Sequence, residues 1–255
     1  MNKNRKIKLA FSFIFLFLFF LYLIFYWREY SEDSITSSNT RTIEKDGFCV
    51  FLNKEYLNTT SFPCNKLKTD ILNNLPRDYI FLDYIYKIKN TALSTFHRDV
   101  TSSQRVYNTQ FPTYTCILYK YSGDLLSICP NSEKTYPFVN SSIINISGNS
   151  GTTFLFNCDI LHSGMQNQCL YREVIQYKLC HKDDLYLLEH LQGINIEKTE
   201  KCEISFYNYS MRKLSYFFEL PINTIFYPIM IKRENKDSLL GIIQSYIPLS
   251  YYNNI

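Results

Sequence analysis

Hydrophobic and polar positions divide this chain into three zones. Residues 9–27 are an uninterrupted apolar run without a charged side chain. At 1.5 Å per helical residue, the run is long enough to cross a hydrocarbon layer of about 30 Å. We therefore predict a transmembrane signal anchor over residues 9–27. The polar residues 28–46 that follow predict a stem, and residues 47–255 predict a folded domain.

The charges beside the apolar run predict its orientation. Lys3, Arg5, Lys6 and Lys8 precede it, in a basic tail over residues 1–8. Positive residues stay on the cytoplasmic side of a membrane. The pattern therefore predicts a single-pass type II membrane protein, with a cytoplasmic N-terminus and a lumenal or extracellular domain. A cleaved signal peptide is disfavoured, because the run is long and no small-x-small cleavage site follows it.

Within the domain, a helical pattern comes first and a strand pattern follows. Residues 65–75 place Leu67, Ile71, Leu72 and Leu75 on one side of a helix that is interrupted at Pro76. From residue 94 to residue 181, short apolar segments alternate with turn residues. This alternation predicts an antiparallel sandwich or small barrel. Residues 183–193 predict a further helix, within a helical and mixed C-terminal extension.

The cysteines and one turn predict a specific disulfide. The eight cysteines all lie after the apolar run, where an even number permits disulfides. None forms a C-x-x-C pair, which disfavours a structural zinc site. The sequence "YTCILYKYSGDLLSICP" predicts a hairpin that turns at Ser122-Gly123. In that register Cys116 faces Cys129.

Charge in the body of the chain excludes one class of partner. The chain holds 27 Lys and Arg against 23 Asp and Glu, and the basic tail accounts for the whole excess. A protein that follows a phosphate backbone needs a basic stripe. No such stripe is visible, so we expect no nucleic-acid partner.

The candidate chemistry begins at His97 and Asp99, in "FHRDV". Residues i and i+2 of a strand share a face, so this H-x-D pair delivers an imidazole and a carboxylate to one side. His162 follows an apolar strand 63 residues after Asp99, which leaves room for the intervening strands of one barrel. Two imidazoles and a carboxylate on one face are the ligands of a non-haem Fe(II) oxygenase. On their own, His97 and Asp99 could equally be ordinary surface residues.

Arg172 adds a second element to this arrangement. It lies ten residues after His162, at the start of the strand "REVIQYKLC". A guanidinium there can form a bidentate pair with a carboxylate, as the far end of 2-oxoglutarate requires. His181 and His190 have no supporting partners and are expected to be structural.

These segments resemble the Fe(II)/2-oxoglutarate-dependent dioxygenases, most nearly the phytanoyl-CoA dioxygenase-like group. The resemblance rests on "FHRDV", "LFNCDILHSGMQN" and "YREVIQYKL" and covers roughly residues 90–180. It implies a mainly β domain with flanking helices, around a double-stranded β-helix (jelly-roll, cupin-like) barrel at about residues 90–181. It also implies that His97, Asp99 and His162 are the catalytic metal ligands and bind Fe(II). Arg172 would bind the cosubstrate 2-oxoglutarate, and ascorbate would serve as reductant.

We therefore expect a membrane-anchored hydroxylase that releases succinate and carbon dioxide. The presence of Asp99 argues against the halogenase variant, in which a small residue leaves space for a halide. Two alternatives remain open. A type II glycosyltransferase would share the anchor and stem, although Asp183-Asp184 is not a D-x-D motif. A non-catalytic, membrane-displayed β-domain, viral in origin, would share the fold. The sequence does not identify the substrate.

Overall fold

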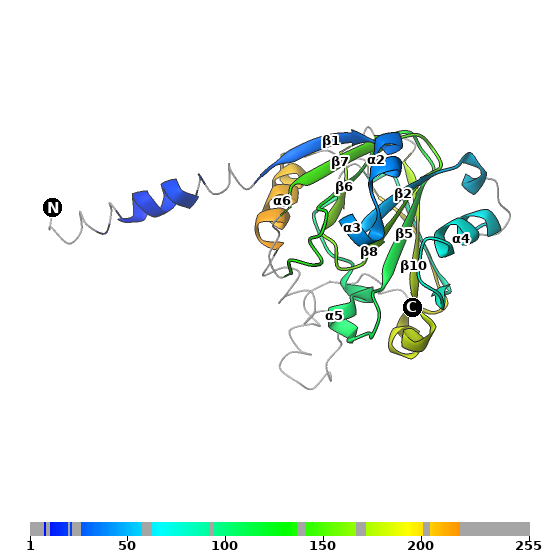
Figure 1. The fold of residues 1–255 in the computed structure, drawn as a ribbon. Coiled ribbons are helices and arrows are strands. Elements are labelled where there is room, and N and C mark those ends of the chain that lie inside the picture. The colour runs from blue at the N-terminus through cyan, green and yellow to red at the C-terminus, as the bar shows by residue number, and fades with distance from the viewer. Residues whose placement is uncertain are drawn as a thin grey trace.

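The chain forms two β-sheets that face one another, with helices around them (Figure 1). The computed structural model describes residues 8, 11–19, 21, 27–57, 63–91, 94–136, 141–166, 172–200 and 205–219. In this part of the chain the two sheets have no strand in common. The fold is therefore mainly β, with mixed sheets and flanking helices, and the described residues do not form the closed barrel that we expected.

The larger sheet has seven strands. Its order is β11 (Ile194–Thr199), β4 (Tyr84–Lys89), β10 (Glu173–His181), β5 (Tyr114–Tyr119), β8 (Thr152–Asn157) and β2 (Phe48–Leu52), and β3 (Tyr79–Phe81) also pairs with β10. The β11 and β4 strands are parallel, and the other pairs are antiparallel.

The smaller sheet has the order β1 (Glu29–Asp33), β7 (Ile143–Gly148), β6 (Gly123–Ile128) and β9 (His162–Gly164). Its β1 strand runs parallel to β7, and β6 is antiparallel to both of its neighbours. The short β9 strand lies at the edge of this sheet, where His97 forms an isolated bridge with His162.

The main hydrophobic core lies between the two sheets, because alternate residues of each strand point to opposite faces. On β5, Ile117 and Tyr119 face the smaller sheet, whereas Cys116 and Leu118 belong to a second cluster. That second cluster contains Leu67 of α4 (Asn65–Leu72) and covers the outer face of the larger sheet. Each fully buried Leu or Ile side chain contributes about 1.5–3 kcal/mol.

The remaining helices are short, apart from α6 and η3. They are α2 (Ser34–Thr40), α3 (Ile43–Asp46), α5 (Gln104–Tyr107), α6 (Phe206–Phe217) and the 3₁₀ segments η1 (Lys54–Leu57), η2 (Val100–Ser102) and η3 (Lys182–Leu191). The helix predicted from residue 65 is confirmed, with Leu67 and Ile71 fully buried. The helix predicted at 183–193 is η3, a 3₁₀ segment with a kink at Leu188.

The predicted hairpin is wrong. Both edges of β5 are already hydrogen-bonded, to β10 on one side and to β8 on the other, so no edge is left for β6. The chain instead crosses to the smaller sheet after β5. Cys116 lies in the outer cluster of the larger sheet and Cys129 lies in a cluster with Phe96. Both are free thiols, as are the other four described cysteines.

The N-terminal segments also differ in part from the expectation. The segment expected to be a stem, residues 28–46, contains β1, α2 and α3, and β1 is a strand of the smaller sheet. Residues 11–19 are helical and lie apart from the two sheets in Figure 1. The predicted span, residues 9–27, falls partly outside the described residues. No helix in the described part of the chain combines the length and apolar character of a membrane crossing.

Candidate metal centre

The two histidines of the predicted site are a cross-strand pair. The backbone N–H of His97 donates to the carbonyl of His162 at 2.9 Å, and the N–H of His162 donates to the carbonyl of His97 at 3.0 Å. Directly opposed residues of an antiparallel pair project their side chains from the same face. The two imidazole rings consequently lie with their centroids 4.5 Å apart.

Asp99 completes the set from the end of the same segment. Its backbone N–H donates to the carbonyl of Cys158 at 2.8 Å, and η2 begins at the next residue. An aspartate at such a position usually caps the helix with its carboxylate. Asp99 makes no such cap. Its Oδ1 lies instead 3.7 Å from Nε2 of His97 and 3.7 Å from Nε2 of His162.

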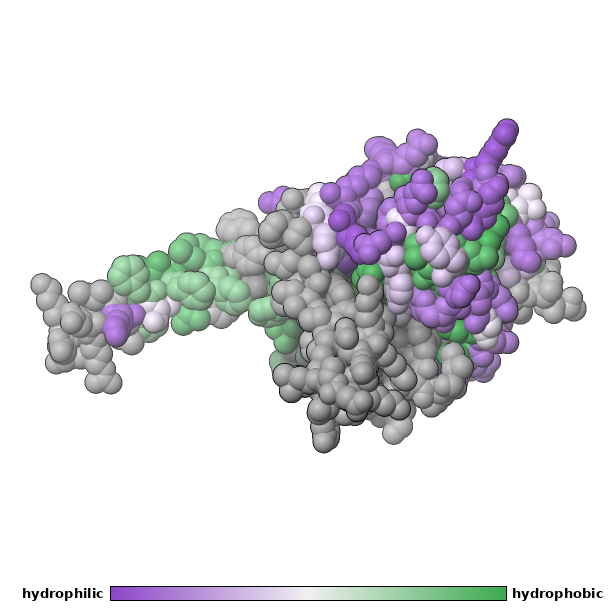
Figure 2. All heavy atoms as spheres, turned by 90° about the horizontal axis from the view of Figure 1, so that it is seen from below, coloured by the Kyte–Doolittle hydropathy of each residue, from purple (hydrophilic) through white to green (hydrophobic). Residues whose placement is uncertain are grey.

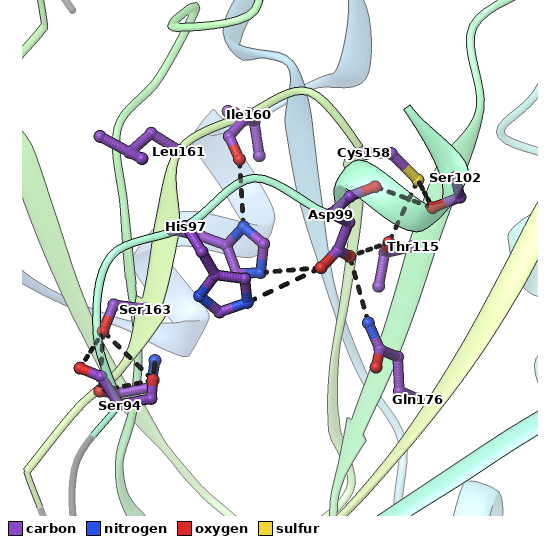
Figure 3. A network of polar contacts seen from close by, with 12 residues as sticks. Ser94, His97, Asp99, Ser102, Thr115, Cys158, Ile160, Leu161, Ser163 and Gln176 are labelled. Atoms are coloured by element: carbon purple, nitrogen blue, oxygen red, sulfur yellow. Dashed lines mark hydrogen bonds and ion pairs between the residues drawn. The ribbon is translucent and has the colours of Figure 1, made fainter. Parts of the chain in front are cut away.

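Both imidazoles present the same nitrogen to the carboxylate (Figure 3). Nδ1 of His97 lies 2.9 Å from the carbonyl oxygen of Thr95, and Nδ1 of His162 lies 3.1 Å from that of Ile160. A carbonyl can only accept, so each Nδ1 carries the proton and each Nε2 keeps a free lone pair. Metal-ligating histidines are oriented in this way.

The ligand atoms of His97, Asp99 and His162 all lie within 4.8 Å of one another. Three such atoms can hold a divalent metal ion, and two imidazoles with one carboxylate are the facial triad of non-haem Fe(II) sites. The structure therefore brings together the three side chains that the sequence predicted as metal ligands, from two segments 63 residues apart.

The second oxygen of Asp99 is held by three donors from the larger sheet. Oδ2 accepts hydrogen bonds from Nζ of Lys178 at 2.7 Å, from Nε2 of Gln176 at 3.1 Å, and from the hydroxyl of Thr115 (Figure 3 draws the last two). Lys178 also donates to Thr115 at 2.8 Å. Oδ2 is therefore hydrogen-bonded within the protein, whereas Oδ1 faces the two histidines.

The charges around Asp99 keep its carboxylate ionised. Burial by itself raises the pKa of Asp99, but the positive charge of Lys178, with contributions from His162 and His97, outweighs burial and lowers the pKa below its ordinary value. Burial lowers the pKa of His162 to about 3, with His97 acting in the same direction. At neutral pH the set therefore offers an anionic carboxylate and a neutral His162 imidazole, which are the protonation states that bind a metal.

Exposure differs among the three ligands. The side chain of His97 is 21% exposed, whereas those of His162 and Asp99 are 3% and 8% exposed. Phe156 covers His162, with ring centroids 4.4 Å apart. The candidate centre is therefore enclosed on the His162 side and reaches solvent at His97.

Arg172 is buried at the start of β10. Its Nη1 donates to the carbonyl of Thr91 at 2.8 Å, and its Nε is buried without a hydrogen-bond partner. Burial raises the pKa of Glu200, but hydrogen bonds to Lys198 and Thr91, together with the charges of Lys198 and Arg172, lower it overall. Arg172 lowers the pKa of Tyr119, although burial is the larger effect and raises that pKa overall. Arg172 is therefore a buried cation whose Nε–H makes no hydrogen bond within the described residues.

Arg172 belongs to the same face of β10 as the residues that hold Asp99. Alternate residues of a strand point to the same face, so Arg172 shares a face with Gln176 and Lys178. Both Gln176 and Lys178 donate hydrogen bonds to Oδ2 of Asp99. Gly164 of β9 leaves space for the guanidinium, because a methyl group at that position would collide with Nη2 of Arg172. Arg172, directly before β10, thus precedes the strand whose Gln176 and Lys178 hold Asp99.

Sequence reasoning missed Lys178, Gln176 and Thr115. The available signal was a lysine inside the apolar strand "REVIQYKLC", two residues before its end. A lysine is almost never fully buried unless it is paired. Lys178 is 1% exposed, so its position predicts a buried carboxylate on the neighbouring segment.

The other histidines and the Asp183-Asp184 pair have structural roles. Nε2 of His190 lies 2.9 Å from the carbonyl of Thr101, and Nδ1 of His181 accepts from the backbone N–H of Asp183. The carboxylate of Asp184 accepts from the backbone N–H groups of Gln110 and Phe111, at 2.9 and 2.8 Å. Asp184 is therefore occupied in holding a loop.

Comparison with known proteins gives distant structural likenesses only. No protein-family model and no curated protein sequence matches the chain. SnoN, a non-heme alpha-ketoglutarate-dependent epimerase from nogalamycin biosynthesis, is 10% identical with a TM-score of 0.45, over 68% of this chain and 95% of that one. HygX from Streptomyces hygroscopicus, solved with iron bound, is 11% identical with a TM-score of 0.40, over 55% of this chain and 84% of that one.

EvdMO1 is 10% identical with a TM-score of 0.40, over 56% of this chain. The match spans about half of EvdMO1, 49% of its length. At these sequence identities and TM-scores, none of these structures indicates what reaction the chain catalyses. Only the geometry of the site indicates a function.

Proposed function

We propose that this protein is an Fe(II)- and 2-oxoglutarate-dependent oxygenase that hydroxylates a substrate and releases succinate and carbon dioxide. The observation that carries the proposal is the convergence of Nε2 of His97, Nε2 of His162 and Oδ1 of Asp99 within 4.8 Å. These atom types and this number of ligands leave coordination positions open for a cosubstrate and dioxygen. The phytanoyl-CoA dioxygenase-like subfamily remains part of the proposal.

His97, Asp99 and His162 would hold Fe(II). When bound, the iron would allow dioxygen to decarboxylate 2-oxoglutarate oxidatively to succinate and carbon dioxide and to hydroxylate a C–H bond of the substrate. The chain's own contribution is to fix the ligands. The carbonyls of Thr95 and Ile160 orient the two imidazoles, and Lys178 holds Oδ2 of Asp99. Ligands oriented in advance lose less freedom when the metal binds.

Arg172 would bind the far carboxylate of 2-oxoglutarate. Its guanidinium is buried and has a donor without a partner among the described residues. Burying a guanidinium is costly, and a bound dianion would offset part of that cost through charge-assisted hydrogen bonds. Arg172 therefore fits the diacid better than it fits a purely structural role.

The glycosyltransferase alternative has less support. The carboxylates that could resemble its metal motif are Asp183 and Asp184, and Asp184 is bonded to two backbone N–H groups. A non-catalytic β-domain has no need of two imidazoles and a carboxylate with their ligand atoms turned toward one point. We also propose the membrane-anchored, type II arrangement that the sequence predicts for residues 1–27.

Metal binding tests the proposal directly. Under anaerobic conditions, Fe(II) or Co(II) together with 2-oxoglutarate should raise the melting temperature of the full chain, because both bind only the folded state. The His97→Gln variant should lose this shift. His190→Gln is the matched control, because His190 lies outside the triad and contacts a backbone carbonyl.

Turnover provides the second readout. Succinate should form in the presence of Fe(II), 2-oxoglutarate and dioxygen, and His97→Gln should abolish its formation while His190→Gln retains it. Equal metal-induced shifts in His97→Gln and the unsubstituted protein would overturn the proposal. A shift caused only by a sugar nucleotide with Mn²⁺ would favour the glycosyltransferase.

A further inference from the structure

The outward face of helix α6 carries exposed aromatic and aliphatic side chains. Tyr207 and Leu214 are seven residues apart, on one side of the helix, and Phe218 follows four residues later, directly after the last helical residue. All three are exposed, and Phe206 beside them is the most exposed large apolar side chain of the described residues. A helix that faces water normally turns polar residues outward. An aromatic and aliphatic stripe instead indicates a contact surface.

The opposite face of α6 is bound tightly to the domain. Arg212 donates to the carbonyls of Ser94 and Gly164, at 3.1 and 3.0 Å, and to the hydroxyl of Ser127 at 2.6 Å. Ser215 accepts from the backbone N–H of Phe96 at 2.8 Å. The outward stripe is therefore held in a fixed orientation and is not an incompletely packed surface.

Trp27 connects α6 to the apolar N-terminal segment. Its ring packs against Tyr216 and Phe217 of α6, with centroids 5.1 and 5.6 Å apart, and against Phe96 at 6.1 Å. Trp27 is the last residue of the apolar run. The run therefore meets the domain at α6, and Figure 1 shows the N-terminal helix projecting from the side of the molecule where α6 lies.

The N-terminal helix itself requires apolar surroundings. The described apolar side chains of residues 11–19 are all exposed, and Figure 2 shows them as a continuous apolar surface beyond the domain. No described part of the domain covers them. A phospholipid bilayer supplies such surroundings, and a bilayer that takes up this helix necessarily comes close to α6.

Charge near α6 fits the same partner. Nζ of Lys213 lies 5.4 Å from the ring centre of Trp27 and 4.9 Å from that of Tyr209. Aromatic rings interspersed with basic side chains are typical of the headgroup layer of a membrane, where the rings take a partly apolar position and the cations meet anionic lipids.

From these observations we propose that α6 is a lipid-contact helix. Its Tyr207–Leu214–Phe218 stripe lies in the headgroup layer of a phospholipid bilayer, next to the apolar N-terminal segment. The inner face of α6 bonds to residues that flank His97 and His162, so membrane contact and the candidate metal centre share one helix. The proposal does not depend on the oxygenase chemistry.

Tryptophan fluorescence provides the test, because the chain contains a single tryptophan, Trp27. The full chain is reconstituted into phosphatidylcholine and phosphatidylserine vesicles, with and without brominated acyl chains, which quench tryptophan on contact. The test variant is Trp27→Phe/Tyr207→Trp. The matched control is Trp27→Phe/Tyr186→Trp. Tyr186 is as exposed as Tyr207, at 68% against 69%, but lies on η3, away from α6.

We expect brominated lipid to reduce emission from position 207 by roughly twofold or more, because interfacial helices reach the acyl-chain boundary. Emission from position 186 should not change. Equal emission from position 207 in vesicles with and without brominated lipid would overturn the proposal. A blue shift that depends on protein concentration and not on lipid would also overturn it, because it would show that α6 contacts a second copy of the chain. If Tyr207→Trp does not fold, Leu214→Trp on the same stripe replaces it, with the same two outcomes. A cooperative urea unfolding transition in each variant verifies that the domain is intact.

Discussion

Lys178 donates a hydrogen bond of 2.7 Å to Oδ2 of Asp99, and the other oxygen of the same carboxylate faces two imidazoles. This ion pair is buried, with side-chain exposures of 1% and 8%. The two charges offset each other's desolvation, and the geometry separates the roles of the two oxygens. One oxygen is fixed by the protein, and the other is available to a metal.

Removing Lys178 should destabilise the fold strongly. Lys178→Met leaves the Asp99 charge buried with only Gln176 and Thr115 as donors, and breaking a buried pair from one side costs about 3–5 kcal/mol. Urea denaturation of the metal-free protein measures this loss. The double variant Lys178→Met/Asp99→Asn should recover a large part of it, because no charge is then left unpaired. A single variant as stable as the unsubstituted protein would contradict the prediction.

The stability of the metal-free protein should fall on mild acidification. Burial lowers the pKa of His162 from 6.5 to about 3. Between these values the unfolded chain binds a proton at this residue and the folded chain does not, so stability is lost as pH falls below 6.5. From pH 7 to pH 5, this residue should contribute a loss of about 2 kcal/mol.

The comparison with His162→Gln isolates this contribution. Burial raises the pKa of Glu133 and Glu219, and these groups change stability in the opposite direction over the same pH range. Urea denaturation of both proteins at pH 7 and at pH 5 gives the difference. The unsubstituted protein should lose more stability than the variant, and equal losses would show that His162 does not titrate as described.

Arg172 should control binding of the cosubstrate and leave metal binding unchanged. Arg172→Ala removes the buried guanidinium, and we expect the affinity of the Co(II)-loaded protein for 2-oxoglutarate to fall by roughly tenfold to a hundredfold, the loss of a charge-assisted hydrogen bond. Arg172→Lys should give an intermediate affinity, since an ammonium group cannot form the bidentate pair.

Calorimetric titration of each Arg172 variant measures its affinity for Co(II) and its affinity for 2-oxoglutarate. Arg105→Ala is a suitable control, because Arg105 is an arginine of α5 that donates to the backbone carbonyl of Glu133. Unchanged 2-oxoglutarate affinity in Arg172→Ala would remove Arg172 from the proposed site. A loss of Co(II) affinity of the same size would indicate instead that Arg172 supports the fold.

The six described thiols should be free and unreactive in the native protein. Burial raises the pKa of Cys49 to about 12 and that of Cys180 to about 12, and it raises the pKa of Cys116 as well. Alkylating reagents attack the thiolate, so labelling should require unfolding. Peptide mapping after alkylation, with and without guanidinium, measures this. A disulfide-linked peptide containing Cys116 and Cys129 would contradict the observed fold.

Local sequence pattern was sufficient for some elements. The i, i+4 spacing of Leu67 and Ile71 predicted α4, because one apolar side of a helix must be buried whatever the neighbour is. The H-x-D pair and the histidine after an apolar strand predicted which three side chains converge. The residue types could be predicted because ligand chemistry restricts them. The expected strand through the H-x-D pair is absent, because His97 forms only an isolated bridge and Asp99 directly precedes η2.

Other features were decided by the tertiary structure. The pairing of Cys116 with Cys129 was wrong because hairpin formation depends on whether an edge of β5 is free, and β8 and β10 occupy both edges. The polar residues 29–46 gave no sign that β1 would join the smaller sheet, since a parallel strand at an edge needs little apolar character.

The sequence by itself determined which side chains can bind a metal, because that depends on the chemistry of individual residues. Only the folded chain decided how those side chains are supported. Lys178 is 79 residues from Asp99 in the chain and 2.7 Å from it in space. Ser215 of α6 bonds to Phe96, beside His97, across 119 residues. Such contacts depend on how the sheets and α6 pack together, and no local pattern encodes that packing.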